Sequence, residues 1–384
     1  MRYEQLEHET REEFLERVKG SDETFEVIRM RRKDGEPVKE ILTDEMISYC
    51  FESGLTVRDL QILTRISKSS MHNYILDWRK RNPAHEIYTK AWTWDEVNLQ
   101  FNKDDIQGDN YIEHVFLLVS DIQAGAMITA FGFDQDPVAT VNAYFNKIIM
   151  NTVKAINSRN LTIGTLNIMM LGDMVEGVKI FPKQLTIQIR PQIDVIVKNM
   201  LQMITYFAGQ SNIQQVDVYG VFGNHGRISW EHATTDNFDQ MAYDRIADRI
   251  EIFKEFKHGD FHKVNADITD DQIQVRTIGK FNYAYTHGDQ IGGLSDGRLI
   301  KMFGEMKDVF EDELETGRVD CMLLGHWHCM RWLIHNQKSI IVNGCTYESP
   351  FARYRILKKS DIIQVLFGQT EDEAVGWVER IKCQ

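Results

Sequence analysis

Five short apolar runs, each followed at once by a polar corner, limit most strongly what this chain can fold into. Each run has the length and composition of a buried strand. The runs span residues 114–120, 168–171, 216–222, 281–286 and 321–324. Helical patterns at 138–158, 192–208 and 238–253 separate several of them. Strand-like runs that alternate with helices predict an α/β fold.

A chain of 384 residues is too long for one small domain, and its pattern of apolar and polar residues changes near residue 111. Short helical patterns precede that point, and the alternating pattern follows it. We therefore predict four parts, namely a charged N-terminal helix (1–40), a small all-α domain (41–83), a connector (84–110) and an α/β domain (111–384).

Composition restricts the classes of protein to consider. The chain is 43% hydrophobic and 26% charged, which is typical of a globular protein and excludes wholesale disorder. Its five cysteines are irregularly spaced without a CxxC pair, which argues against a disulfide framework or a cysteine-based zinc site. The N-terminus is highly charged, and no apolar run reaches membrane-spanning length. We expect a cytoplasmic protein with no membrane partner.

The polar corners carry the side chains that bind metal ions. They are Asp121-Ile122-Gln123, Gly172-Asp173, Gly223-Asn224-His225, His287-Gly288-Asp289 and Gly325-His326-Trp327-His328. Each corner alone could be a turn or part of the core. In α/β sheets, however, ligands bind at the carboxyl ends of the strands, so all five could meet at one site. Carboxylate, carboxamide and imidazole groups together suit manganese, iron, zinc or magnesium.

This set of corners, in this order, resembles the calcineurin-like metallophosphoesterase superfamily over roughly residues 111–350. The resemblance implies a two-sheet β-sandwich flanked by helices. It also implies two divalent metal ions, with Mn²⁺ favoured and Mg²⁺, Fe or Zn²⁺ open. Asp173 would bridge the ions. The remaining ligands would be Asp121 and His328 on the first ion, and Asn224, His287 and His326 on the second. His225 would be catalytic, facing the substrate as a general acid.

Two corners depart from the family pattern. Gln123 stands where the family has histidine, and its neutral amide oxygen would bind the first ion more weakly and favour Mn²⁺ or Mg²⁺, or leave that position open. Arg227 follows His225 and Gly226, where an acidic residue is usual, and we expect it to contact a substrate phosphate. Glu176 is expected to support the site or to lie at the surface instead of binding metal.

The segment from Leu55 to Arg81 carries six basic and two acidic residues, a balance of +4 in a chain whose net charge is −13. Its two short helical patterns around a tight turn resemble a helix-turn-helix DNA-binding domain. The residues expected to face DNA are Lys68, Ser69, Ser70, His72, Asn73, Arg79, Lys80 and Arg81. The alternative is a small helical bundle with a solvated basic face.

These features together predict a hydrolase acting on ester bonds, and specifically a metal-dependent DNA nuclease that the helix-turn-helix domain recruits to DNA. The segments 172–177 and 223–227 most resemble phage-encoded, SbcD-type exonucleases. The sequence after His328 reads as strands and a short tail, so we do not expect an SbcC-like ATPase partner. A homodimer is open by analogy alone. Two alternatives remain, a phosphatase or phosphodiesterase for small phosphoesters and a DNA-binding regulator with a structural metal site.

Overall fold

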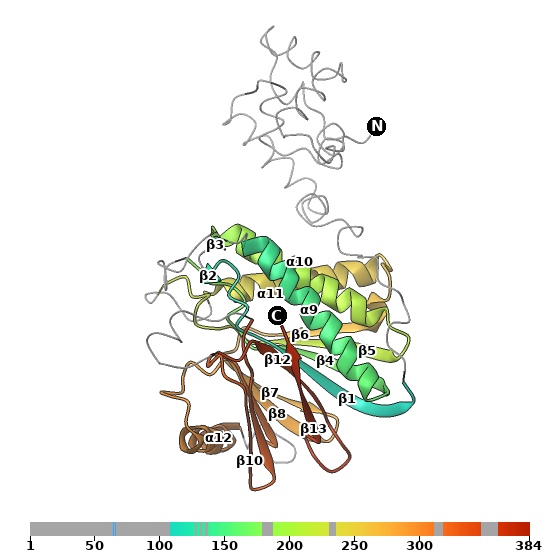
Figure 1. Ribbon diagram of the computed structural model, residues 1–384, viewed down its shortest axis with the longest axis vertical. Helices are drawn as coiled ribbons and strands as arrows, with labels where there is room; N and C mark the ends of the chain where they lie inside the picture. Colours follow the sequence, from blue (N-terminus) through green and yellow to red (C-terminus); the bar gives the residue numbers. More distant parts are fainter. Residues whose placement is uncertain are drawn as a thin grey trace. The chain divides into compact units, whose positions relative to one another are not determined.

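The computed structural model describes residues 64, 66, 108–126, 129–130, 133–134, 137–178, 187–229, 236–310, 318–346 and 360–384. The chain forms two compact units, Met1–Thr93 and Trp94–Gln384, and the helices and strands below belong to the second (Figure 1). The predicted N-terminal helix, the helix-turn-helix-like domain apart from Thr64 and Ile66, and nearly all of the connector lie outside the described residues. The eight residues predicted to face DNA lie there too.

Six of the described strands form the first sheet, in the order β13–β12–β1–β4–β5–β6. In chain order they are β1 (Asn110–Val119), β4 (Leu161–Met170), β5 (Ile213–Gly220), β6 (Val264–Ile268), β12 (Ile363–Gly368) and β13 (Trp377–Lys382). β1, β4, β5 and β6 run parallel, whereas β12 and β13 add on antiparallel beside β1. The carboxyl ends of the four parallel strands therefore share one edge.

Five further described strands form the second sheet, in the order β10–β11–β9–β8–β7. They are β7 (Ile273–Ile278), β8 (Phe281–Thr286), β9 (Cys321–Leu324), β10 (Arg331–His335) and β11 (Lys338–Val342). β8, β9 and β11 are parallel, and the two outer strands are antiparallel. Two short strands, β2 (Thr129–Ala130) and β3 (Phe133–Asp134), pair separately.

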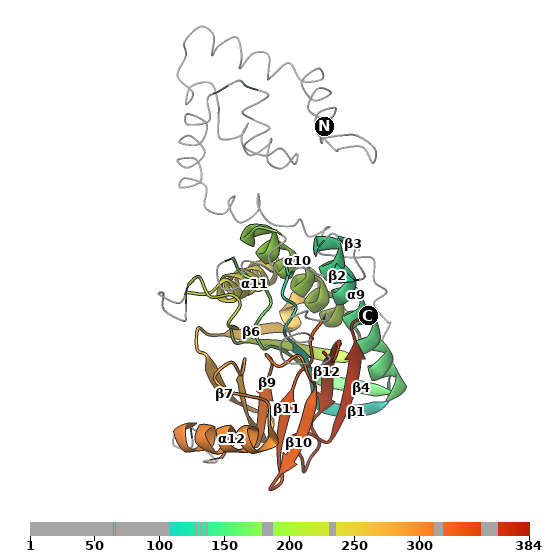
Figure 2. The same ribbon diagram turned by 60° about the vertical axis from the view of Figure 1, so that its left-hand side comes forward.

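The described elements stack in four layers of helices, sheet, sheet and helix (Figures 1 and 2). Three helices cover the outer face of the first sheet, α9 (Pro137–Ser158), α10 (Ile189–Ala208) and α11 (Phe238–Glu255). α12 (Asp296–Phe310) covers the outer face of the second, and a short 3-10 turn, η2 (Phe261–Lys263), precedes β6. None of these described helices is long and apolar enough to span a membrane.

The main core lies between the two sheets. Phe116 of β1 stacks on Phe367 of β12, with ring centroids 4.5 Å apart, and also contacts Tyr283 of β8. Every residue of β8 is buried, because Tyr283 faces this core and Ala284 faces α12. A strand covered on both faces requires a nearly continuous apolar run, which explains the pattern in the sequence.

The predicted α/β fold with two sheets flanked by helices is confirmed. The five apolar runs correspond to β1, β4, β5, β8 and β9, and the three helical patterns to α9, α10 and α11. Sequence patterns alone do not give the bounds of β6, β7, β10 and β11, because these strands are short or partly exposed.

Candidate metal centre

Each of the five polar corners follows the carboxyl end of a parallel strand. Three come from the first sheet, after β1, β4 and β5, and two from the second, after β8 and β9. The corners bond to one another across the two sheets. The Asp121 carboxylate accepts from the backbone N–H of His326, at 3.1 Å for the nearer oxygen, and Gly325 N donates to the carbonyl of His287 at 3.0 Å.

The backbone turns sharply at these corners. Five predicted ligands have φ between 47° and 70°, in the left-handed region, and they are Asp121, Gln123, Asp173, His326 and His328. Non-glycine residues rarely adopt this region, and where they do the strain often marks a functional site. β9 ends at Leu324, so His326 and His328 lie in a loop. The loop, and not an extended strand with both imidazoles on one face, therefore sets the directions of the two rings.

Four side chains converge on one point. The ligand atoms of Asp173, His287 and His326 lie within 4.8 Å of one another. His287 Nε2 is the central atom, 3.0 Å from Asp173 Oδ2, 3.2 Å from Asn224 Oδ1 and 3.2 Å from His326 Nδ1. The other ring nitrogen of His287 lies 2.7 Å from the carbonyl oxygen of Leu171, an arrangement that directs Nε2 at the cluster.

A second group of side chains adjoins the first. His328 Nε2 lies 3.2 Å from Asp121 Oδ1 and 3.4 Å from the Gln123 amide nitrogen. That same amide nitrogen lies 3.2 Å from His225 Nε2, which is in turn 3.8 Å from Asp173 Oδ2. The structure thus places every predicted metal ligand, Gln123 included, in one continuous group around Asp173.

The first group fits a divalent cation. Asp173 Oδ2 is buried, and His287 Nε2 lies 3.0 Å away from it. If the Nδ1–H of His287 donates to Leu171, a neutral ring turns a lone pair toward the carboxylate. Two facing lone pairs require positive charge between them, from a proton or from a cation. Carboxylate, carboxamide and imidazole ligands suit a cation of the Mn²⁺, Fe or Zn²⁺ type.

The pKa values of Asp173 and His287 also indicate that this group of side chains favours positive charge. Burial acts to lower the pKa of His287, but the charge of Asp173 outweighs it and raises the pKa to about 10. Burial likewise opposes ionisation of Asp173, yet His287 and His225 hold the pKa of its carboxyl well below the usual range. Burial, followed by the charge of His287, lowers the pKa of His326 to about 4. The cluster therefore contains an ionised carboxylate, one imidazole with a raised pKa (His287) and one with a lowered pKa (His326).

His225 is oriented by Glu176, which contacts its ring from the opposite side to the cluster. Glu176 Oε2 lies 3.0 Å from His225 Nδ1, and the two side chains are 1% and 13% exposed. Burial opposes protonation of His225, but Asp173 and Glu176 together raise its pKa. An acidic partner for this histidine thus exists, three residues after Asp173 in the sequence. It replaces the acidic neighbour that the sequence lacks at Gly226-Arg227.

Arg227 lies at the end of the same loop and forms an ion pair with Asp289. Its Nη2 atom is 3.6 Å from Asp289 Oδ2, and both side chains are partly exposed, at 18% and 19%. Asp289 follows the predicted ligand His287 by two residues, as Arg227 follows His225. This ion pair therefore links the loops after β5 and β8.

Sequence reasoning missed the buried polar network that holds Asp121. Ser120 Oγ donates to Asp121 Oδ2 at 2.5 Å and accepts from Asn343 Nδ2 at 2.9 Å. Asn343 also donates to Gln364 Oε1, which accepts from the Ser120 backbone N–H as well. The four side chains are all 0% exposed. Their separation along the chain hides the network from pattern analysis, because no local motif connects them.

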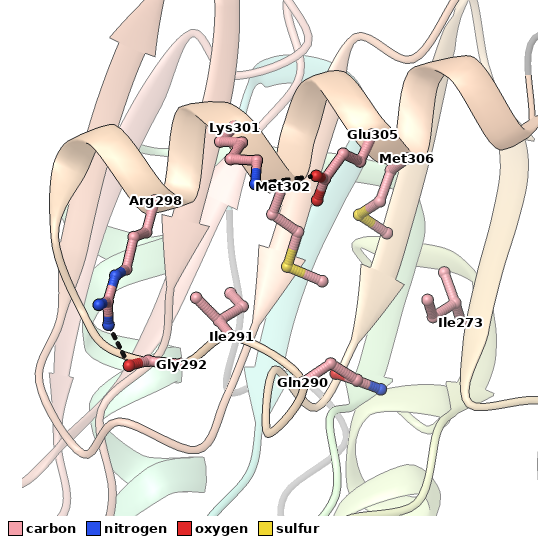
Figure 3. A pocket seen from close by; sticks show the side chains of 9 residues that line it. All are labelled: Ile273, Gln290, Ile291, Gly292, Arg298, Lys301, Met302, Glu305 and Met306. Atoms are coloured by element: carbon pink, nitrogen blue, oxygen red, sulfur yellow. Dashed lines mark hydrogen bonds and ion pairs between the residues drawn. The ribbon is translucent and has the colours of Figure 1, made fainter.

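The glycine-rich segment 288–298 forms one wall of a pocket of about 450 Å³ beside α12 (Figure 3). Ile291, Met302 and Met306 give it an apolar lining, and Arg298 Nη1 donates to the carbonyl of Gly292. Its lining, as far as the described residues define it, contains none of the predicted metal ligands.

No protein-family model matches the sequence, and no curated protein matches it. Among solved structures, a novel archaeal phosphodiesterase aligns with 70% of this chain and 98% of its own, at 13% identity and a TM-score of 0.32. Vps29 from Entamoeba histolytica, complexed with zinc, covers 70% and 99% at 13% identity and a TM-score of 0.32. A hypothetical protein from Pyrococcus horikoshii covers 70% and 87% at 11% identity and a TM-score of 0.36. These are distant likenesses.

Proposed function

We propose that the chain is a metal-dependent hydrolase of phosphoester bonds of the calcineurin-like metallophosphoesterase type. The observation that carries the proposal is the convergence of Asp173, Asn224, His287 and His326 on one point, with Asp121 and its neighbours adjoining it. Divalent cations held by these side chains would polarise a phosphoryl oxygen and lower the pKa of water. Both effects accelerate the hydrolysis of phosphoesters.

His225 has the position of a proton donor. Hydrolysis breaks the bond between phosphorus and an ester oxygen, and the departing oxygen must gain a proton. Because Glu176 holds Nδ1 of the His225 ring, Nε2 faces the metal ligands, 3.8 Å from Asp173 Oδ2. We assign His225 the protonation of the leaving oxygen, and Glu176 the orientation of the ring.

Arg227 is the residue that we expect to bind the substrate phosphate. Its guanidinium can form paired hydrogen bonds to phosphate oxygens, and its ion pair with Asp289 fixes its direction. A phosphate that binds there would compete with Asp289 for the same donors. Substitution of Asp289 should therefore affect the Michaelis constant more than the rate of the bound substrate.

DNA is the substrate that we propose, and two sequence features support it. The segment from Leu55 to Arg81 has a local charge of +4 within an acidic chain and resembles a helix-turn-helix. The corners at 172–177 and 223–227 resemble those of SbcD-type exonucleases. The proposed reaction is cleavage of DNA phosphodiesters with Mn²⁺, with the N-terminal segment recruiting the DNA.

The test is cleavage of linear and circular DNA, in single- and double-stranded form, by the full chain with Mn²⁺. Asp173→Asn is the control, because it keeps the shape of the side chain and removes its charge. We expect cutting that depends on Mn²⁺ and is lost in the variant. Hydrolysis of a small aryl phosphodiester without cutting of any DNA form would refute the nuclease assignment and favour small phosphoesters.

A second comparison tests the recruitment of DNA. Arg79, Lys80 and Arg81 are replaced together by Gln in the full chain. We expect weaker DNA cleavage, with a shallower salt dependence, and unchanged hydrolysis of the small diester, because the substitutions remove phosphate contacts alone. Equal DNA cleavage by the variant and the wild type would refute recruitment by this segment.

A further inference from the structure

A buried aspartate joins the two loops that follow β4 and β5. Asp239 lies in the first turn of α11, and 0% of its surface is exposed. Its Oδ2 atom accepts from the backbone N–H of Asp173 at 2.8 Å and of Gly223 at 2.9 Å. Its Oδ1 atom accepts from Met174 and Val175, each at 3.0 Å. One carboxylate therefore satisfies four backbone donors from two ligand loops.

The geometry of the β4 loop suits this contact. Gly172 and Asp173 have φ of 82° and 53°, and three successive N–H groups from Asp173 onward point to one side. Successive backbone N–H groups arranged in this way form a concave site for an anion. The Asp239 carboxylate is that anion. The conformation that presents Asp173 to the metal centre is thus the one that Asp239 stabilises.

The two loops are packed too closely to move independently. A Cβ atom on Gly223 would lie 2.1 Å from Asp173 Oδ1, so only glycine fits at this position. Asn237 Nδ2 also donates to the carbonyl of Gly223 at 2.7 Å. The N-terminus of α11 therefore fixes the β5 loop against the β4 loop through two side chains, Asp239 and Asn237.

Capping of α11 does not account for Asp239. Asn237 performs that role, because its side-chain oxygen accepts from the backbone N–H of Asp239 at 2.8 Å. The carboxylate of Asp239 contacts the ligand loops instead. A residue that only capped the helix would leave those four donors without this acceptor.

We infer that Asp239 is a positioning residue of the metal centre, which holds the loops after β4 and β5 at the separation where Asp173 and Asn224 reach the same cation. The inference rests on the proposed function, because it assumes that these side chains bind metal. Asp239 itself touches neither cation nor substrate.

The test is Mn²⁺ binding by Asp239→Asn in the full chain. A carboxamide offers one acceptor oxygen and turns an NH₂ group toward two of the four donors. We expect the Mn²⁺ dissociation constant to rise at least tenfold in calorimetry, and the electron paramagnetic resonance spectrum of bound Mn²⁺ to change, with a native circular dichroism spectrum. Asp320→Asn is the matched control. Asp320 is also buried and accepts from the Asn282 N–H, but at the opposite end of β8, so its variant should bind Mn²⁺ as the wild type does.

Wild-type Mn²⁺ binding by Asp239→Asn would overturn the inference, and so would an equal loss in both aspartate variants. If Asp239→Asn does not fold, Asp239→Glu replaces it, since glutamate keeps the charge but moves the carboxylate by one methylene relative to the four donors. Weaker Mn²⁺ binding is expected there, and unchanged binding overturns the inference. A wild type that binds Mn²⁺ but hydrolyses no phosphoester refutes the proposed function alone. A wild type that binds no Mn²⁺ refutes both.

Discussion

Glu176→Gln is the substitution that best tests the proton transfer proposed for His225. It removes the charge from a buried contact, in which Glu176 Oε2 lies 3.0 Å from His225 Nδ1. A hydrogen bond to a charged group contributes about 1.5–3 kcal/mol. This contact favours the protonated ring of His225. If His225 must be protonated to act as the acid, loss of this energy should lower the protonated fraction, and with it the rate constant, by about 10- to 150-fold. The shape of the side chain is kept, so the fold should be preserved.

The assay compares two phosphodiesters that differ in their leaving group, one aryl and one alkyl, with the full chain and Mn²⁺. An alkyl oxygen needs a proton to depart, whereas a nitrophenolate does not. We therefore expect the large decrease in kcat for the alkyl ester and little change for the nitrophenyl ester. Glu379→Gln is the control, because Glu379 pairs with Arg159 outside the metal centre, at 3.0 Å. Its activity on both esters should equal that of the wild type.

Two results would contradict the assigned roles. The first is an equal loss of rate for both esters, since it would point to the metal ligands and not to proton transfer. The second comes from the double variant with His225→Ala. If Glu176 acts only through His225, the double variant should be no slower than His225→Ala alone. Additive losses would show that Glu176 acts independently.

Three other predictions follow from the same geometry. Gln123→His should tighten Zn²⁺ binding relative to Mn²⁺, because an imidazole replaces a carboxamide. A competition titration measures this, and an unchanged preference would count against Gln123 as a ligand. Removal of divalent ions with EDTA should lower Tm in calorimetry, and Mn²⁺ should restore it, because a cation that binds only the folded chain stabilises it. Phe116→Ala should reduce the free energy of unfolding by about 3–5 kcal/mol, since the ring is fully buried between the sheets. Urea denaturation tests this, with the half-exposed Phe256→Ala as the control that should change little.

The place where the predicted ligands come together could be predicted from the sequence because these residues follow apolar runs. A strand buried on both faces leaves a clear signal, and the corner after it is where a ligand can lie. β8 is the clearest case, since all six of its residues are buried and His287 follows at once. The same logic located Asp121, Asp173 and Asn224, whose roles as metal ligands stay predictions.

What the sequence could not show is how distant polar residues support those corners. Asp239 reads as an ordinary acidic residue in the first turn of a helix, and only the fold reveals that it accepts four N–H groups from other loops. Glu176 reads equally well as a surface residue. Its contact with His225 depends on how the β4 and β5 loops pack, and that packing depends on Gly223.

The wide separation of the ligands along the chain has a consequence for folding. Gln123 and His328 contact each other but are 205 residues apart, and they come from different sheets. Contacts at such sequence separation form late, because long loops must close before the contact forms. Neither sheet alone can assemble the group. We therefore expect a refolding chain to acquire tight Mn²⁺ binding only in its last kinetic phase. The rate of Mn²⁺ uptake would then report the rate at which one sheet docks on the other.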